Sequence, residues 1–325
     1  MMNAVGTQEI KTLVFHETLA EDIVIAMRSR GAPGEIVSCA TEYDFEAEAA
    51  KCDVLMAAHC DLRPVMNNPH LRWVQSLASG IETWLAPPGP PQCPVTRMTG
   101  VYEAYMAEYV VAHLLWRSQR LEDLRAAQMS KTWIEPLGLQ ATLLRGKRVG
   151  IAGLGHVGTA VARACAALNM QVIGLRREVR TDEPVPHVEQ VFPIADKARF
   201  LQDLDYLVLA MPLTPASTHF LNTEALHTLP PRAVVVNISR GGLVDESALV
   251  DALKSGEVSG AVLDTFEVEP LSKASPLWDL RGVTITPHMA GAVYADEGAA
   301  VCARNLKLFA SGHLPEPIVD LTTGY

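Results

Sequence analysis

The stretch KRVGIAGLGHVGTAVARACAALNMQVIGLRR, from Lys147 to Arg177, contains the pattern that decides the fold of this chain. An apolar run at 148–152 precedes three glycines with the spacing G-x-G-x-x-G, namely Gly153, Gly155 and Gly158. An alanine-rich segment at 159–170 has the spacing of a helix, and a second apolar run follows at 171–175. The order of strand, glycine turn, helix and strand is typical of a βαβ unit that binds a dinucleotide.

Each glycine of this motif serves a different physical purpose. Gly153 permits the tight turn at the end of the strand, and Gly155, which has no Cβ, lets a pyrophosphate approach the backbone. Gly158 lets the helix pack close to the sheet. The helix N-terminus adds free N–H groups and a positive dipole end. We expect a dinucleotide here rather than a glycine turn without a ligand, because the motif has its required context.

Length, composition and charge narrow the class of protein. The chain has 325 residues, enough for two domains with sizeable cores, and 49% of them are hydrophobic, as in a globular protein. Its formal net charge of −10 argues against nucleic acid or an anionic membrane as the main partner. An anionic substrate would therefore need a local cluster of positive groups.

The N-terminus, the lack of a long apolar run and the cysteines together predict a cytoplasmic protein without a zinc site. The N-terminus has no basic stretch followed by an apolar core, and no apolar run approaches the roughly 20 residues of a membrane span. The 6 cysteines are scattered without a C-x-x-C pair. We therefore expect the cysteines to be reduced thiols rather than zinc ligands or members of a disulfide framework.

Short apolar segments alternate with helical ones, which predicts parallel α/β sheets. Strands are expected at 11–17, 35–40, 52–58 and 73–78, and again at 204–210, 233–238, 260–263 and 283–285. Helices are expected at 19–30, 100–121, 217–229, 245–255 and 298–310. The sequence thus describes two α/β parts with different sequences, and the helix at 100–121 is placed to connect them.

Polar residues follow the strands of the second part. Arg240, Asp264 and His288 come at or just beyond strand ends, and Glu269 lies a few residues after Asp264. Singly, they could be a surface ion pair, a solvated acid or a core histidine. Together, a cation, acids and a histidine at the sheet edge that binds a dinucleotide indicate a catalytic site.

These residues suit hydride transfer to a 2-oxo acid. Arg240 can bind carboxylate and carbonyl oxygens through its planar guanidinium. His288 can donate the proton, since a histidine titrates near pH 6.5, and Glu269 can fix the tautomer of the imidazole. The reaction needs no metal, and no cluster has the spacing of metal ligands. In the first part, Ser79 and Gly80 also follow a strand, although spacing alone favours an ordinary turn there.

Over nearly its whole length, the chain resembles the D-isomer-specific 2-hydroxyacid dehydrogenase family. Several ordered motifs carry the resemblance: Gly153–Gly158, Pro212–Thr214, Asn237–Asp245, Leu263–Leu271 and Thr286–Gly291, with Met106–Val110 as the connector helix. The resemblance implies an α/β fold with a Rossmann-type doubly wound parallel sheet as cofactor domain, residues 101–291. A smaller flavodoxin-like α/β substrate domain would be split between 1–100 and 292–325. It also implies a homodimer, with the connector helix at the interface.

The same resemblance assigns roles to single residues. It implies a catalytic set of Arg240, Glu269 and His288, of which Arg240 and His288 also bind the substrate. It implies that the backbone of 78–80 contacts the substrate carboxylate, in place of the plain turn, and that Asp264 faces the nicotinamide carboxamide. The substrate contacts of this loop are Ala78, Ser79 and Gly80. The implied cofactor contacts are Gly153, Gly155, His156, Val157, Gly158, Arg176, Arg177, Pro212, Thr218, Ile238, Ser239, Asp264 and Gly291.

One position departs from the usual pattern for NAD. The second strand of an NAD-binding unit normally ends in Asp or Glu, which binds the ribose 2′-OH. Here that place holds Arg176, followed by Arg177, and two cations can pair with a 2′-phosphate. We therefore expect a preference for NADP(H), with a site that also accepts NAD(H) as the alternative.

Within the family, the chain looks most like the glyoxylate/hydroxypyruvate reductase group. The arginine at 176 and the short loop at 77–81 carry this similarity. Two readings stay open beside it: a dehydrogenase for a bulkier 2-oxo acid, or one like phosphoglycerate dehydrogenase. A non-catalytic NAD(P)-sensing protein of the corepressor type is a third alternative.

Overall fold

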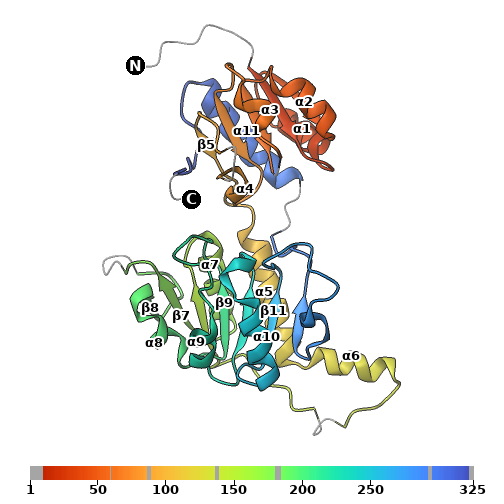
Figure 1. Cartoon of the computed structure of the whole chain (residues 1–325), viewed down its shortest axis with the longest axis vertical. Coiled ribbons are helices and arrows are strands. Elements are labelled where there is room, and N and C mark those ends of the chain that lie inside the picture. Colours follow the sequence, from red (N-terminus) through yellow and green to blue (C-terminus); the bar gives the residue numbers. More distant parts are fainter. Residues whose placement is uncertain are drawn as a thin grey trace. The chain divides into compact units, whose positions relative to one another are not determined.

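The computed structural model describes residues 10–58, 60–85, 89–135, 139–179, 184–291 and 295–321, except the side chains of residues 82 and 83. The chain divides into two units, shown in Figure 1. Unit 1 comprises Met1–Val101 and Val293–Tyr325, and unit 2 comprises Tyr102–Ala292. The expected domain boundaries, at 100/101 and 291/292, each fall one residue earlier.

Unit 2 is built on a seven-stranded sheet with the strand order β12-β11-β10-β9-β6-β7-β8. Its strands pair in parallel. β6, the first of them in sequence, lies inside the sheet, and the chain builds outward from it in both directions. This is the doubly wound arrangement that the sequence predicted, with its switch point between β6 and β9. The strands are β6 (Arg148–Ala152), β7 (Gln171–Arg176), β8 (Gln190–Pro193), β9 (Tyr206–Leu209), β10 (Val234–Asn237), β11 (Gly260–Leu263) and β12 (Val283–Ile285).

Helices of unit 2 cover both faces of this sheet. The α-helices are α5 (Glu103–Ser118), α6 (Leu121–Met129), α7 (His156–Ala167), α8 (Lys197–Leu201), α9 (Thr223–Thr228) and α10 (Glu246–Ser255). Three short 3-10 turns are η2 (Ile194–Asp196), η3 (Gly241–Leu243) and η4 (Pro276–Asp279).

Side chains alternate between two separate cores, one on each face of the sheet. On β9, Val208 packs into the core that contains residues of α5 and α7, while Leu207 and Leu209 pack into the core beside α8, α9 and α10. Both faces are apolar, which explains why the strands read as continuous hydrophobic runs.

Unit 1 carries the smaller sheet, with five parallel strands in the order β2-β1-β3-β4-β5. This order is the flavodoxin-like one that was expected for the smaller part of the chain. The strands are β1 (Lys11–Phe15), β2 (Glu35–Cys39), β3 (Val54–Ala57), β4 (Trp73–Ser76) and β5 (Val95–Thr96). The helices are α1 (Ala20–Ser29), α2 (Glu42–Ala49), α3 (Arg63–Met66), α4 (Glu82–Leu85) and α11 (Ala295–Ala310).

Within unit 1, a buried polar network joins the last helix, α11, to strand β4. The Nδ2 of Asn305, on α11, donates to Gln75 Oε1 at 2.8 Å and to the carbonyl of Glu316 at 2.8 Å. Gln75 Oε1 also accepts a 2.9 Å hydrogen bond from the Thr96 hydroxyl, which itself accepts one from Trp73 Nε1. Because these side chains are fully buried, their hydrogen bonds fix where the returning chain docks on β4.

Two predicted helices differ from the structure. The helix expected at 100–121 ends at Ser118, because Arg120 takes a left-handed backbone with φ of 54° and α6 starts separately. The helix expected at 217–229 is wrong over its first half, since α9 begins only at Thr223. Its cap is Asn222, whose side chain accepts the Ala225 amide, and such local bonds compete with an earlier helix start.

Candidate active site

Every strand of the larger sheet runs in the same direction, so the carboxyl ends all lie at one edge. Along this edge, strand order places the segments in the sequence His288, Asp264 with Glu269, Arg240, Pro212, Gly153 and Arg176. Arg240 thus follows the strand next to that of Glu269. From β11 to β7 the edge measures about 19 Å, at about 4.8 Å for each of four strand spacings.

The glycine turn has the geometry that a dinucleotide needs. Gly153 has a φ of +98°, and a Cβ there would lie 2.5 Å from the carbonyl oxygen of Ala210. At Gly158, a Cβ would lie 1.9 Å from the Gly153 carbonyl oxygen, so only glycine allows α7 this close approach. At Gly155, by contrast, a Cβ would meet no atom within 4 Å. Open space therefore lies where the pyrophosphate is expected.

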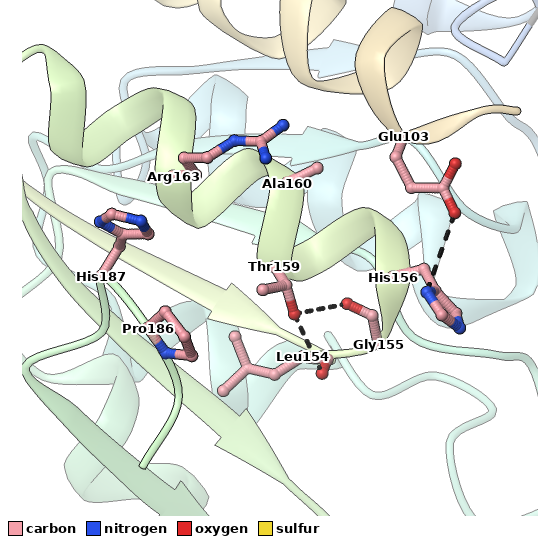
Figure 2. Close-up of a pocket in the computed structure, with 9 residues that line it drawn as sticks. All are labelled: Glu103, Leu154, Gly155, His156, Thr159, Ala160, Arg163, Pro186 and His187. Carbon is pink, nitrogen blue, oxygen red and sulfur yellow. Dashed lines mark hydrogen bonds and ion pairs between the residues drawn. The ribbon is translucent and has the colours of Figure 1, made fainter. Parts of the chain in front are cut away.

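The first turn of α7 borders a cavity of about 580 Å³. Gly155 is the N-cap of α7, so the N–H groups of the residues that follow have no partner inside the helix. Figure 2 shows Arg163 and His187 on one flank of the cavity, and His156 with Glu103 on the other. His156 Nδ1 lies 4.0 Å from Glu103 Oε1. The helix N-terminus and the guanidinium of Arg163 would suit the phosphates of a dinucleotide.

The sequence motifs did not identify three of the residues that line this cavity. Arg163 lies on α7 one turn beyond Thr159, and His187 lies in the crossing from β7 to β8. Glu103 opens α5, more than fifty residues earlier in the chain. The helical spacing of Arg163 relative to the glycine turn was the one signal available, because no motif marks the other two.

At the far end of this edge, Arg176 is the last residue of β7. Its Nη2 donates to the carbonyl of Leu154 in the glycine turn at 3.0 Å. Arg177 follows it at the surface. The guanidinium of Arg176 is therefore anchored beside the turn, and its other N–H groups can still serve a ligand.

Arg240 is held by a loop that joins two strand ends. The fully buried Asn237 accepts the Ser239 amide at 3.1 Å and donates to the carbonyl of Arg240 at 2.9 Å. The Ser239 hydroxyl donates to the carbonyl of Met211, which follows β9, at 2.5 Å. Arg240 itself is half-buried, and its Nη1 donates to the Ser239 carbonyl at 2.8 Å. These backbone contacts of the loop help to set the position of the cation.

His288 and Glu269 form the pair that the sequence suggested. His288 Nδ1 lies 2.8 Å from Glu269 Oε2, and the other oxygen, Oε1, accepts the amide of Phe266 at 3.0 Å. Both side chains are partly exposed, at 49% and 36%. With its carboxylate oriented by the Phe266 amide, Glu269 places a proton on Nδ1, so Nε2 is the nitrogen that can exchange a proton with a substrate.

Asp264 is buried and surrounded by groups of the chain itself. Its Oδ1 accepts the Met289 amide at 2.8 Å and the Thr286 hydroxyl at 2.5 Å, and its Oδ2 accepts the Ala290 amide at 2.9 Å. The side chain was expected to face the nicotinamide carboxamide, and a contact of that kind remains a prediction. What the geometry provides is a carboxylate that fixes the segment around His288.

The remaining predicted residues lie where the motifs placed them. Ile238 is buried after β10, and Pro212 follows β9 in a turn whose Thr218 hydroxyl donates to the Thr214 carbonyl at 2.9 Å. A Cβ at Gly291 would lie 3.3 Å from the Tyr102 ring. Val157 stands on the first turn of α7. In the described parts of the chain, no group of three or more His, Cys, Asp and Glu is arranged to hold a metal.

In unit 1, the loop after β4 presents backbone donors. The Ala78 amide donates to the Ser76 hydroxyl at 3.0 Å, so its hydrogen is already used. Within the residues that the structure describes, the amides of Ser79 and Gly80 have no acceptor. Two of the three expected substrate contacts are therefore available for a ligand.

Among the residues that the structure describes, no helix is long and apolar enough to cross a bilayer.

The glycine turn on a doubly wound sheet, with Arg240, Glu269 and His288 along the same edge, is typical of an NAD(P)-dependent oxidoreductase. The sequence model of the D-isomer specific 2-hydroxyacid dehydrogenase NAD-binding domain matches residues 111–290. The chain belongs to this family, as the resemblance of its motifs indicated.

Named relatives support the same conclusion. A glyoxylate reductase of Thermofilum pendens is 34% identical over 70% of this chain and 68% of its own length. The crystal structure of an NADPH-dependent glyoxylate/hydroxypyruvate reductase from Sinorhizobium meliloti, in complex with NADP and sulfate, has a TM-score of 0.87. It is 28% identical and covers 98% of this chain and 100% of its own. A family member from Aeromonas salmonicida has a TM-score of 0.88 at 27% identity, over 96% of this chain and 99% of its own.

The surroundings of the glycines predict that one substitution weakens cofactor binding and another weakens the fold. Gly155→Val places its side chain in open space, so the fold should tolerate it while affinity for NADPH falls at least about tenfold. Gly158→Ala forces α7 away from the Gly153 carbonyl and should lower the unfolding free energy by about 2 kcal/mol or more. Fluorescence titration with NADPH and urea unfolding measure the two effects. Normal NADPH affinity in Gly155→Val would show that the dinucleotide lies elsewhere.

Proposed function

We propose that the protein reduces a small 2-oxo acid, of the glyoxylate or hydroxypyruvate kind, to a D-2-hydroxy acid with NADPH. The observation that carries the proposal is the 2.8 Å contact of His288 with Glu269, next along the sheet edge to Arg240. The glycine turn on the same edge supplies the place for a nicotinamide cofactor. The names of the relatives above support the size and class of the substrate.

The chemistry divides between the cofactor and the chain. When bound, NADPH supplies the hydride, which adds to the carbonyl carbon of the 2-oxo acid. Arg240 binds the carboxylate and polarises the carbonyl, so that it stabilises the negative charge that develops on the oxygen. His288 gives the proton on Nε2 to that oxygen, and the resulting imidazole regains a proton from water.

Glu269 and the loop of unit 1 assist this transfer. Glu269 keeps the proton of Nδ1 in place and orients the ring of His288, the acid of the proposed step. The Ser79 and Gly80 amides are proposed to bind the substrate carboxylate, since a carboxylate readily accepts two backbone N–H groups. The sum of the steps is one 2-oxo acid, one NADPH and one proton giving one 2-hydroxy acid and one NADP⁺.

The preference for NADPH rests on the end of β7. No carboxylate stands at the position that would bind a ribose 2′-OH, and Arg176 is already anchored next to the turn through the Leu154 carbonyl. An arginine binds a phosphate with several charge-assisted hydrogen bonds. We propose that Arg176 and Arg177 together select the 2′-phosphate, and a structural relative that holds NADP supports this.

The exposed helix α6 supports the expected homodimer. None of its residues is buried, and Figure 1 shows it reaching away from the sheet of unit 2. Leu124 and Met129 on this helix are 42% and 68% exposed, and Trp133, just after it, is 84% exposed. Apolar side chains gathered in this way usually meet a partner surface. We propose that the partner is a second copy of the chain.

The thiols suit the proposed cytoplasmic setting. The 6 cysteines are free, and burial raises the pKa of Cys165 and Cys302 to about 12. Thiols of this kind are stable in a reducing compartment and poor nucleophiles.

Loss of the proton donor should stop turnover but not cofactor binding. His288→Ala should lower kcat at least about 100-fold for glyoxylate and hydroxypyruvate, while the Kd for NADPH stays within about threefold. A matched control is His219→Ala, because His219 also pairs with an exposed glutamate, at 3.3 Å from Glu267. The proposed function would be contradicted if the parent protein oxidised NADPH with none of a panel of 2-oxo acids. It would also be contradicted if His288→Ala kept the kcat of the parent protein.

A charge swap at the end of β7 should exchange the cofactor. In Arg176→Asp/Arg177→Ser, the ratio of kcat/KM for NADPH to that for NADH should fall at least about 100-fold, because charge-assisted bonds to the 2′-phosphate are lost. Arg163→Ala, which removes a cation lining the cavity beside α7, is the control and should leave the ratio unchanged. A parent protein that prefers NADH would refute the assignment.

Charges on α6 should separate the dimer. The double substitution Leu124→Glu/Met129→Glu should convert a species of twice 35.2 kDa into the 35.2 kDa monomer in sedimentation equilibrium. Tyr43→Glu changes a residue that is 82% exposed on unit 1, and it should leave the mass unaffected. A monomeric parent chain would overturn the proposal.

A further inference from the structure

The segment that contains His288 is wrapped around one residue. The His288 amide donates to the backbone carbonyl of Asp264 at 2.9 Å. The next two amides, of Met289 and Ala290, donate to the two carboxylate oxygens of Asp264 at 2.8 and 2.9 Å. Three consecutive amides therefore converge on Asp264, and the course of the backbone through His288 depends on it.

This course is one that a histidine does not take freely. His288 has a φ of +53°, in the left-handed region, which costs roughly 1 kcal/mol or more for a residue with a Cβ. The hydrogen bonds on both sides of its Cα hold it there. Since φ sets the direction of the Cα–Cβ bond, Asp264 also determines where the imidazole points. The same conformation accompanies the 2.8 Å contact between His288 and Glu269.

A chain of hydroxyl groups holds Asp264 in turn. Thr286 Oγ1 lies 2.5 Å from Asp264 Oδ1, and the Tyr109 hydroxyl lies 2.6 Å from Thr286 Oγ1. An ionised carboxylate only accepts, so the threonine hydrogen is directed to Asp264. The lone pair of the threonine then receives the tyrosine hydrogen. This gives one direction of donation along the chain: Tyr109 to Thr286 to Asp264.

The surroundings keep this direction fixed. Burial raises the pKa of Tyr109 to about 12, so its phenol retains the proton that it donates. The centroid of the Tyr109 ring lies 4.3 Å from the centroid of the His113 ring, one turn further along α5. Burial lowers the pKa of His113, which favours the neutral ring beside Asp264. Tyr109 and Thr286 are thus neutral donors, and His113 is a titratable side chain close enough to interact with the charge of Asp264.

We propose that Thr286 and Tyr109 are positioning residues for proton transfer by His288, acting through Asp264; this rests on the proposed function. Without the Thr286 hydroxyl, the carboxylate keeps only the amides of Met289 and Ala290, so its orientation is held less firmly. The imidazole then moves relative to Glu269 and to the substrate oxygen. Arg240 and the glycine turn come from other strands, so the contacts that they make to substrate and cofactor should change little.

The test compares two substitutions at one position. Thr286→Val keeps the shape and removes the hydroxyl, and it should lower kcat about 10- to 100-fold with little change in KM or in the Kd for NADPH. Thr286→Ser restores the hydroxyl and should restore kcat to within about threefold of the parent enzyme. Tyr109→Phe leaves the bond from Thr286 to Asp264 intact, and its loss of kcat should be smaller than that of Thr286→Val.

The pH profile separates positioning from mere stability. In Thr286→Val, the pH profile of kcat should differ from that of the parent enzyme, because the imidazole has lost part of its contact with Glu269. Rates are expressed per site that binds NADPH, so that misfolded protein does not count. A Thr286→Val enzyme with lower Tm but the parent's kcat and pH profile would overturn the proposal.

Failure of the proposed function would look different. If the parent protein reduced no 2-oxo acid, the activity assignment would fall, and NMR titration of the His288 ring would decide the positioning alone. Different ring shifts and a different titration midpoint in Thr286→Val than in the parent and Thr286→Ser would support it. Identical titrations in the three proteins would refute it.

Discussion

The structure of unit 2 depends on one constraint, the parallel pairing of its strands. Parallel ladders require each connection to cross back over the sheet, so all carboxyl ends, with the loops that follow them, lie along one edge. Residues as far apart in sequence as Gly153 and His288 thereby share that edge. No further long-range contact is needed to bring the glycine turn and the predicted catalytic residues to one edge of this sheet. The apolar faces of the sheet and the helices over them supply its rigidity.

Local polarity, not net charge, prepares this edge for anions. The chain carries a net charge of −10, yet the ligands expected at the site are phosphates and carboxylates. The positive end of α7, the arginine at the end of β7 and Arg240 each act over a few ångströms. Because salt screens distant surface charge strongly, we expect such nearby groups to decide the binding of these ligands. The acids that take part, Glu269 and Asp264, are directed toward a histidine and toward backbone amides.

Backbone geometry is what gives these side chains their direction. Asn237 fixes the loop of Arg240 by two hydrogen bonds, and Asp264 fixes the segment of His288 by three amides. In both cases a buried polar residue at a strand end satisfies the groups that the strand leaves unpaired. The directions of Arg240 and His288 therefore rest on residues that need not touch a substrate. The hydroxyl groups of Thr286 and Tyr109 extend the same arrangement to α5.

The sequence by itself determined the glycine turn, the strands and the order in which polar residues follow them, because these depend on local pattern and on the rules of parallel sheets. It also indicated the pair of His288 and Glu269. Only the tertiary structure decided the left-handed backbone of His288, the bond between Tyr109 and Thr286, and the docking of Asn305 on Gln75. It also moved the start of α9 to Thr223 and left α6 uncovered. The physical reason is that hydrogen bonds between distant segments, and caps that compete with a helix, depend on which groups meet after packing.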